Sequence, residues 1–246
     1  MLFGTDFADE MVGYGLDDTR RINGICDFLQ EKFVMEKEDD NMIYFTSDLH
    51  LGHRGIIGMQ NRPFENVQEM NLVLIRNYNS VVHKNDTVYI LGDISHHLPM
   101  DRANELIGKL NGKKILIKGN HDKKYDSKLF EEICDFKTVS LNGMYFALMH
   151  YPMLSWPKKN RGSIQLHGHM HAREEYNLQN KVDGIRRYDV GVDANKYYPV
   201  SVKRIIEFLG NAEIKVTEKA GEETDNVKIK IVEKSEIPIF LQSLRM

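Results

Sequence analysis

The stretch Lys114-Ile115-Leu116-Ile117-Lys118-Gly119-Asn120-His121-Asp122 sets the fold class of this chain. Its three consecutive aliphatic residues are typical of a short buried strand, and the Gly-Asn that follows marks a turn at the end of such a strand. An amide, an imidazole and a carboxyl group therefore stand at the carboxyl end of the predicted strand. The same pattern, a short apolar run that ends in Gly, Asp or His, recurs at residues 42–48, 87–93, 144–150, 164–169 and 188–193.

Helical patterns separate these predicted strands. Apolar residues spaced three or four apart predict a helix between Val67 and Val81, and shorter stripes predict two more at 103–110 and 129–134. Alternating strands and helices indicate an α/β fold with a largely parallel sheet at first and more β structure later. Residues 151–163 and 172–186 are long for connections, so we expect functional loops there.

Three parts are expected along the chain. Residues 1–41 form an acidic extension in which the apolar residues from Ile22 to Phe33 predict a helix, either packed on the main domain or bound to a partner. Residues 42–200 form the core. Residues 201–246 add an appendage: a helix with Ser201 as its N-cap, and a β-hairpin predicted by the alternation of apolar and polar residues at 214–231.

Composition limits the class of protein. The 246 residues, 41% of them hydrophobic, suffice for one large folded domain. The longest apolar run, Met144–Met149, is far shorter than the about 20 residues of a membrane-spanning helix, and the acidic N-terminus lacks the basic region of a secretory signal. Two cysteines outside any short motif exclude a disulfide framework and a Cys-based zinc site. We therefore expect a soluble, cytoplasmic protein that has no membrane partner.

Charge is distributed unevenly along the chain. Residues 1–41 carry 11 acidic and 4 basic side chains, so within the total of −3 the remaining residues have a net charge of +4. A mildly basic body suits a small phosphorylated substrate. It lacks the strong positive field that is typical of a protein dedicated to duplex DNA.

Histidine is the most informative residue type, because nine of the ten histidines lie in or beside the ends of the predicted strands and only His83 does not. Asp, His and Asn side chains are ligands for ions such as Mn²⁺, Fe²⁺ and Zn²⁺. Asp48 and His50 are two residues apart, so in an extended segment both point the same way, and the same holds for His169 and His171. Taken alone, Asp-x-His and Gly-Asp are more typical of turns, whereas Gly-Asn-His-Asp and His-Gly-His-Met-His are stronger signals that a solvated surface or a single metal would still explain. The ordered set indicates a metal centre.

In its ordered motifs the chain resembles the calcineurin-like metallophosphoesterases. Their pattern is Asp-x-His, Gly-Asp, Gly-Asn-His-Asp, a single His and Gly-His-x-His, and all five blocks stand in this order within residues 44–171. The segments Asn61-Arg62-Pro63-Phe64 and His150-Tyr151-Pro152-Met153 resemble a small bacterial and phage branch of that family. The resemblance implies a four-layer α/β/β/α sandwich with two divalent metal ions between the sheet ends. Manganese is the first expectation, and iron, zinc or nickel are alternatives.

The resemblance also implies a role for each residue of the motifs. His121 would face the substrate without binding metal, and Asp122 would orient the His121 ring. Asp93 would bridge the two ions. The first ion would be held by Asp48, His50, Asp93 and His171, and the second by Asp93, Asn120, His150 and His169.

The chain departs from the family pattern at one position. Many members carry Gly-Asp-x-x-Asp, whereas His96 takes the place of the second Asp here, which argues against a Ser/Thr protein phosphatase. Arg54, Arg62 and His97 are candidates for contacts with a substrate phosphate, against surface or structural roles. Trp156 is a candidate for stacking on a nucleobase, against packing within its loop.

These residues predict a dimetal phosphoesterase. Two cations would neutralise a phosphomonoester or phosphodiester and generate a bridging hydroxide for in-line attack on phosphorus, while His121 protonates the leaving oxygen or stabilises the transition state. The expected partner is a small phosphorylated or nucleotide-like substrate. A metal-dependent nuclease on single-stranded or structured nucleic acid is the alternative, a non-catalytic scaffold is a weaker one, and a homodimer stays open.

Overall fold

The computed structural model of the chain describes residues 41–210, so the helix predicted at 22–33 and the hairpin predicted at 214–231 lie outside the described residues. Its first sheet has the strand order β4-β3-β2-β1-β9. The strands are β1 (Ile43–Thr46), β2 (Thr87–Ile90), β3 (Lys113–Ile117), β4 (Glu132–Cys134) and β9 (Val200–Ser201). Strands β1 to β4 run parallel, and β9 pairs antiparallel with β1.

The register of this sheet brings three of the sequence motifs to one edge. Thr46 is in register with Ile90, and Ile90 with Leu116, so β1, β2 and β3 end level with one another. The residues that follow these strands therefore start from a common edge, at the carboxyl ends of parallel strands where α/β proteins place their sites.

The second sheet has the order β5-β6-β7-β8 and supplies the remaining motifs. Its strands are β5 (Phe136–Leu141), β6 (Met144–Met149), β7 (Ile164–His167) and β8 (Arg187–Asp189). Strands β6, β7 and β8 are parallel, whereas β5 and β6 form a hairpin around Asn142-Gly143, both with positive φ. Asn-Gly is the preferred pair for such a two-residue turn. The hairpin was therefore detectable in the sequence from this pair, although not from the apolar runs.

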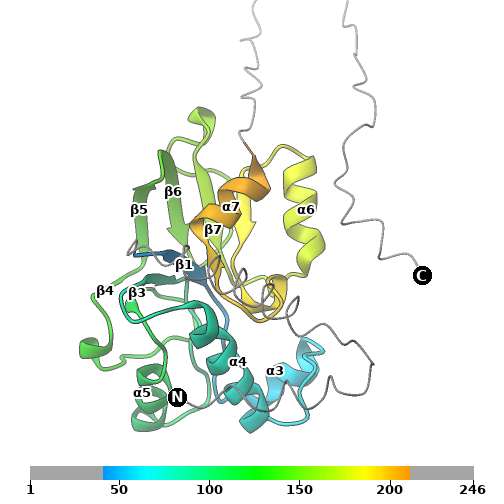
Figure 1. Cartoon of the computed structure of the whole chain (residues 1–246). Helices are drawn as coiled ribbons and strands as arrows, with labels where there is room; N and C mark the ends of the chain where they lie inside the picture. Colours follow the sequence, from blue (N-terminus) through cyan, green and yellow to red (C-terminus); the bar gives the residue numbers. More distant parts are fainter. Residues whose placement is uncertain (1–40, 211–246) are drawn as a thin grey trace, which may run out of the picture. The chain divides into compact units, whose positions relative to one another are not determined.

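Helices cover the outer faces of the two sheets and complete the four-layer α/β/β/α sandwich that the family resemblance implies (Figure 1). Helices α3 (Arg54–Met59), α4 (Val67–Val81) and α5 (Met100–Gly108) lie with the first sheet, and α6 (Glu174–Val182) lies with the second. Helix α7 (Val202–Leu209) follows β9 and packs against β1 and β9. Asn66 caps α4 by accepting a hydrogen bond from the Glu69 N–H. The predicted boundaries of this helix are confirmed.

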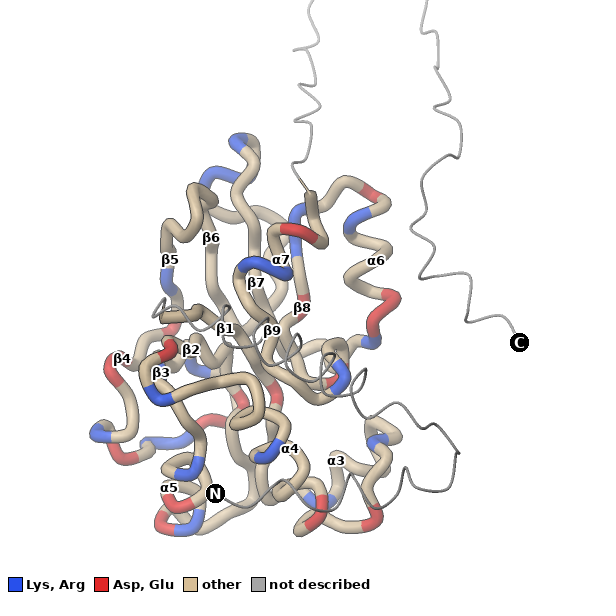
Figure 2. Tube along the Cα trace, viewed as in Figure 1, with Lys and Arg blue, Asp and Glu red and all other residues tan. Residues whose placement is uncertain are grey.

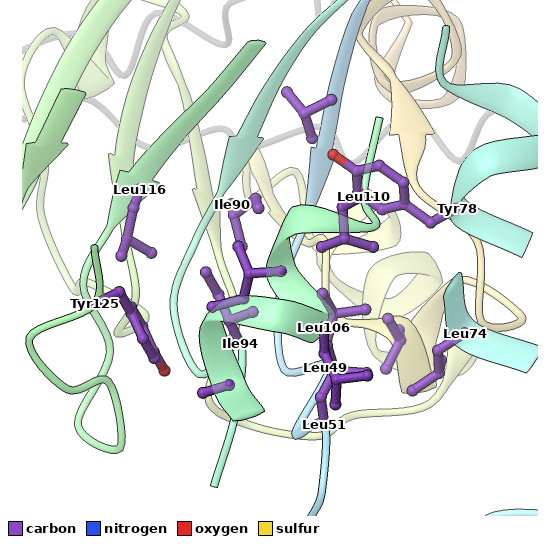
Figure 3. Packing of buried hydrophobic residues seen from close by; sticks show 14 of the residues in the cluster. Leu49, Leu51, Leu74, Tyr78, Ile90, Ile94, Leu106, Leu110, Leu116 and Tyr125 are labelled. Carbon is purple, nitrogen blue, oxygen red and sulfur yellow. The ribbon is translucent and has the colours of Figure 1, made fainter. Parts of the chain in front are cut away.

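Two hydrophobic cores hold the layers together. In the first core, Tyr78 of α4 and Leu106 of α5 pack against Ile90 and Leu116 of the first sheet (Figure 3). The second core lies between the sheets, with Phe45 and Tyr89 from the first sheet facing Phe146 and Leu166 from the second. Because both faces of β1 and β2 are buried, these strands are continuous apolar runs.

Two of the predicted elements are different in the structure. The stripe at 129–134 is not a helix: a short 3₁₀ turn (Ser127–Leu129) precedes strand β4, whose backbone hydrogen bonds are satisfied by parallel pairing with β3. Residues 172–186 are not an open loop but contain α6. This helix escapes the hydrophobic pattern because it buries Asn177 and Asn180 while Leu178 and Val182 are exposed.

Helix α7 begins after Ser201, as the sequence predicts, but it is not part of a separate appendage. Ser201 caps α7 by accepting a hydrogen bond from the Arg204 N–H. The apolar face of α7 is buried in the core between the sheets, so this helix is integrated into the sandwich. Among residues 41–210, the structure has no helix long and apolar enough to cross a membrane.

Candidate metal centre

Five of the seven predicted ligands stand in left-handed turns after their strands, which differs from the extended geometry that the sequence suggests. Asp48, His50 and Asp93 have φ values of 57°, 49° and 55°, and His169 and His171 of 69° and 47°. Asp48 and His50 therefore converge through turns and not through the alternation of a strand. Left-handed conformations cost non-glycine residues of order 1 kcal/mol each and concentrate at functional sites.

Asp93 lies at the middle of the site. Its Oδ2 is 3.5 Å from Nε2 of His50 and 3.5 Å from Nε2 of His150, which come from different sheets. Its other oxygen, Oδ1, accepts a hydrogen bond from the backbone N–H of His121 at 2.9 Å. One carboxylate oxygen is thus fixed by the protein, and the other faces two groups of candidate ligands.

The first group is Asp48, His50 and His171. Asp48 Oδ2 accepts hydrogen bonds from the Ser47 hydroxyl and the His169 N–H, whereas Asp48 Oδ1 and His50 Nε2 are buried without a hydrogen-bond partner. Nε2 of His171 lies 4.0 Å from Asp48 Oδ1. Buried polar atoms without partners are costly, so two such atoms facing one point fit a bound cation.

The second group is Asn120, His150 and His169. The side-chain oxygen of Asn120 lies 3.0 Å from Nε2 of His150 and 3.0 Å from Nδ1 of His169. Asn120 comes from the end of β3, and the two histidines from the ends of β6 and β7. An amide oxygen and two imidazole nitrogens are ligands for divalent transition metals.

Hydrogen bonds on the far side of the rings fix which nitrogen faces the centre. Nδ1 of His150 lies 2.7 Å from the carbonyl oxygen of Leu91, and Nδ1 of His171 lies 2.9 Å from Oδ2 of Asp193. Both acceptors require a proton on Nδ1. The lone pair of each ring is therefore on Nε2 and directed at the centre, the arrangement that supports metal ligands in proteins.

Comparison with known proteins agrees with this arrangement. The model of the calcineurin-like phosphoesterase family matches residues 42–148. An uncharacterized protein of Methanocaldococcus jannaschii is 39% identical over 175 residues, which cover 70% of this chain and 93% of that protein. This chain belongs to the calcineurin-like phosphoesterases. Membership of this family supports metal-dependent hydrolysis of phosphoesters as the general type of reaction.

Other relatives of this chain come from phages and bacteria. The gene 66 proteins of Mycobacterium phages L5 and D29 are 29% and 30% identical to it, over 86% and 88% of their own lengths. A crystal structure of a protein of unknown function from Aquifex aeolicus has 29% identity and a TM-score of 0.57, and the match covers 68% of this chain and 99% of that one. These relatives agree with the small bacterial and phage branch that the sequence resembles.

Arg62 does not have the role predicted for it. The residue is only 3% exposed, and its guanidinium forms a two-point ion pair with Asp193 and donates to the carbonyl oxygens of Asp48 and Leu49. All of these partners belong to the protein, so Arg62 is not free to clamp a substrate phosphate. It instead fixes the backbone of the first motif and the carboxylate that orients His171.

Asp193 was not among the residues predicted for the site. Burial acts to raise the pKa of its carboxyl group, but the hydrogen bonds from His171 and Arg62 outweigh burial and lower that pKa. The available signal was its place after an apolar run, which is where the other site residues stand.

Asp122 also differs from its predicted role. Its carboxylate accepts hydrogen bonds from the backbone N–H groups of Asp93, Ile94 and Gly119 and from the Tyr125 hydroxyl, so it does not orient the ring of His121. Burial raises the pKa of Asp122 even though these bonds act in the opposite direction. Asp122 thus ties together the loops after β2 and β3 that present Asp93 and Asn120.

The remaining candidates, His121, His97, Arg54 and Trp156, differ in how exposed their side chains are. The half-buried ring of His121 is 5.5 Å from the ring of His50, between centroids, and 4.1 Å from that of His96. His97 is exposed beside His96, and Arg54 is exposed at the start of α3. Trp156 is 6% exposed and its indole N–H donates to the Ser163 carbonyl, so of its two possible roles the structure has the one in which Trp156 packs within its loop.

The electrostatics of the site favour a bound cation. Burial raises the pKa of Asp48 to about 8 and, together with nearby positive groups, holds the pKa of His50 far below its usual range. Because His50 is neutral, it does not compensate the charge of an ionised Asp48. The buried carboxylate therefore needs another positive charge to stay ionised, and a bound cation supplies it.

The backbone at Gly168 leaves no room for a side chain. A Cβ at this position would lie 1.9 Å from Ser47 Oγ and 2.3 Å from Asp48 Oδ2. The glycine therefore lets β7 approach the end of β1 closely enough for the His169 N–H to reach Asp48.

Proposed function

We propose that this chain hydrolyses a phosphomonoester or phosphodiester of a small or nucleotide-like molecule at a centre of two divalent cations. The observation that carries the proposal is the position of Asp93 Oδ2, which is equally distant, at 3.5 Å, from the His50 and His150 nitrogens. A shared carboxylate between two groups of ligands is what two mutually repelling cations require.

The chain supplies a distinct group of residues for each cation. Asp48, His50 and His171 would hold the first ion, Asn120, His150 and His169 the second, and Asp93 both. The mixture of carboxylate, amide and imidazole ligands suits Mn²⁺, with iron, zinc and nickel as alternatives. When bound, these ions would neutralise the phosphate and lower the pKa of a coordinated water toward ~7.

His121 would act on the leaving group. Its backbone N–H is bonded to Asp93, so the residue is held beside the centre, while its half-buried ring has no other hydrogen bond among the described residues and is open to substrate. Such a ring can donate a proton to the leaving oxygen or stabilise the charge of the transition state, a contribution of ~10²–10⁴-fold.

A small substrate with an aromatic group fits the surroundings of the centre better than duplex nucleic acid. Tyr151 is exposed, and its ring centroid lies 4.6 Å from that of His169, so it offers a stacking face at the second group of ligands. Figure 2 shows Lys and Arg interspersed with Asp and Glu along the described chain, without the one-signed stripe of a nucleic-acid track.

The test is an assay of the Mn²⁺-loaded protein on a chromogenic phosphomonoester and phosphodiester, followed by a panel of phosphorylated metabolites that includes cyclic nucleotides. Hydrolysis that disappears in Asp93→Asn and persists in the exposed control Asp101→Asn supports the proposal. No turnover of any ester by a protein loaded with two ions would refute it. Cleavage of single-stranded nucleic acid in preference to every small ester would favour the nuclease alternative.

A further inference from the structure

A cluster of three histidines lies beside the centre and belongs to neither group of ligands. Each of His53, His96 and His97 offers a ring nitrogen, and these nitrogens all lie within 4.8 Å of one another. The ring centroids of His53 and His96 are 4.5 Å apart, those of His96 and His97 3.8 Å, and those of His53 and His97 5.3 Å. Three imidazoles thus face one small volume.

The backbone is shaped to bring these rings together. His53 is the N-cap of α3, and the His96 N–H donates to the Leu51 carbonyl, which brings the loop after β2 next to the start of α3. Successive side chains of an extended segment point in opposite directions, yet His96 and His97 share a side because His97 has a left-handed φ of 58°. This conformation is costly for a residue other than glycine, which favours a function for the cluster.

We propose that His53, His96 and His97 form a third cation site, selective for Zn²⁺ and chemically similar ions over Mn²⁺. The site contains only imidazole nitrogens, which suit zinc, cobalt, nickel and copper, whereas Mn²⁺ prefers the carboxylate and amide oxygens of the main centre. Zinc binds imidazole nitrogen at ~2.0–2.1 Å, so the rings need to close slightly around the ion.

The position of the cluster determines how tightly it would bind a cation and how the cation would reach it. Nδ1 of His53 lies 3.4 Å from Nδ1 of His50, so the third ion would sit close to the cations of the main centre and be repelled by them. We therefore expect it to bind more weakly than the ions there. His97 is exposed, which opens the cluster to solvent, and three protein ligands leave a fourth position for water or an anionic oxygen.

The test compares ions bound per chain in the full-length protein after equilibrium dialysis against Zn²⁺ or Mn²⁺. With Zn²⁺, the wild-type chain should hold one ion more than His97→Ala and one more than His53→Ala. With Mn²⁺, the wild-type protein and His97→Ala should hold the same number. His83→Ala, which removes an exposed histidine far from the cluster in sequence, should keep the wild-type zinc count and so controls for adventitious binding to surface imidazoles.

A spectroscopic measurement separates this proposal from the function of the main centre. Co²⁺ added to the Mn²⁺-loaded protein should give intense visible bands of low-coordinate cobalt, which His97→Ala should lose. The bands should persist in Asp93→Asn, because Asp93 is not a ligand of the third site. Equal zinc counts in wild type and His97→Ala, or loss of the central Mn²⁺ together with the extra zinc ion, would overturn the proposal whatever the result of the hydrolysis assay.

Discussion

Arg62 and Asp193, which are 131 positions apart in the chain, form a buried ion pair in which Nε lies 3.0 Å from Oδ1 and Nη2 lies 2.8 Å from Oδ2. The same Oδ2 is 2.9 Å from Nδ1 of His171. The pair therefore connects the segment before α4 with the loop after β8, and it fixes the ring of a candidate metal ligand. Its effect on the metal centre is exerted through orientation and not through contact.

Replacing Arg62 with Met should damage both stability and metal binding. The change leaves Asp193 buried without its main partner, which costs about 3–5 kcal/mol in the free energy of unfolding. A less firmly oriented His171 should weaken metal affinity by about 10–100-fold. Urea unfolding and metal titration measure the two effects, and Arg54→Met at an exposed position should change neither. A stable variant with unaltered metal affinity would contradict this account of Arg62.

Asp93→Asn should lower the occupancy of both cations together. The amide has nearly the shape of the carboxylate but lacks the charge that lies between two groups of ligands, where the cations repel each other. Elemental analysis after reconstitution with Mn²⁺ should give about two ions per chain for the wild-type protein and fewer than one for the variant. Loss of a single ion would show that Asp93 serves only one of the groups.

Gly168→Ala should disrupt the site although it adds one methyl group. The new Cβ would overlap Ser47 Oγ and Asp48 Oδ2, so the loop after β7 has to move away from the end of β1. We expect reduced metal binding and a loss of stability of about 1–3 kcal/mol from overpacking. Gly58→Ala is the matched control, because this helical glycine has no atom within 4 Å of the added Cβ and the change should be neutral or stabilising by up to about 1 kcal/mol. Equal effects of the two changes would refute the argument.

Much of the fold was predictable because strand ends and helix faces leave local signals. The apolar runs before Asp48, Asp93 and Asn120 are parallel strands buried on both faces, and the stripe from Val67 to Val81 is an amphipathic helix of the predicted length. Helix α6 was not predictable from the same rule, because Asn177 is buried to bond the backbone of Asp189 while Leu178 faces solvent. Hydrogen bonds determine which face of α6 is buried, and a search for apolar periodicity does not detect them.

The candidate site, like the fold, was predictable only in part: its ligands were predictable from the sequence, and the contacts that support them were not. Histidines and carboxylates at strand ends identify the residues that meet, since the carboxyl ends of parallel strands share an edge. The sequence does not reveal which polar residue supports another when the contact is long-range. Arg62 was therefore predicted to bind substrate, whereas its partner Asp193 lies 131 residues away. Asp122 was likewise assigned to the His121 ring, whereas it bonds three backbone N–H groups.

His121→Ala should lower hydrolysis while leaving both cations bound. Its backbone N–H, which an alanine retains, is what contacts Asp93, so the variant keeps the hydrogen bond that positions this carboxylate. The loss of one acid–base or electrostatic group should reduce kcat by about two to four orders of magnitude. Elemental analysis measures the metal content and an assay with a single substrate measures kcat. His83→Ala should change neither quantity. A missing metal ion in His121→Ala would show instead that the imidazole is a ligand.

The dependence on the leaving group then decides what the His121 ring does. A substrate that departs as nitrophenolate needs little protonation, whereas an alkoxide leaving group needs a proton in the transition state. If His121 is the general acid, His121→Ala should slow hydrolysis of an alkyl phosphoester far more than that of a nitrophenyl ester, so a plot of log kcat against the pKa of the leaving group becomes steeper in the variant. If His121 only stabilises charge on phosphoryl oxygens, that charge is similar for all esters, and the two proteins should give parallel lines.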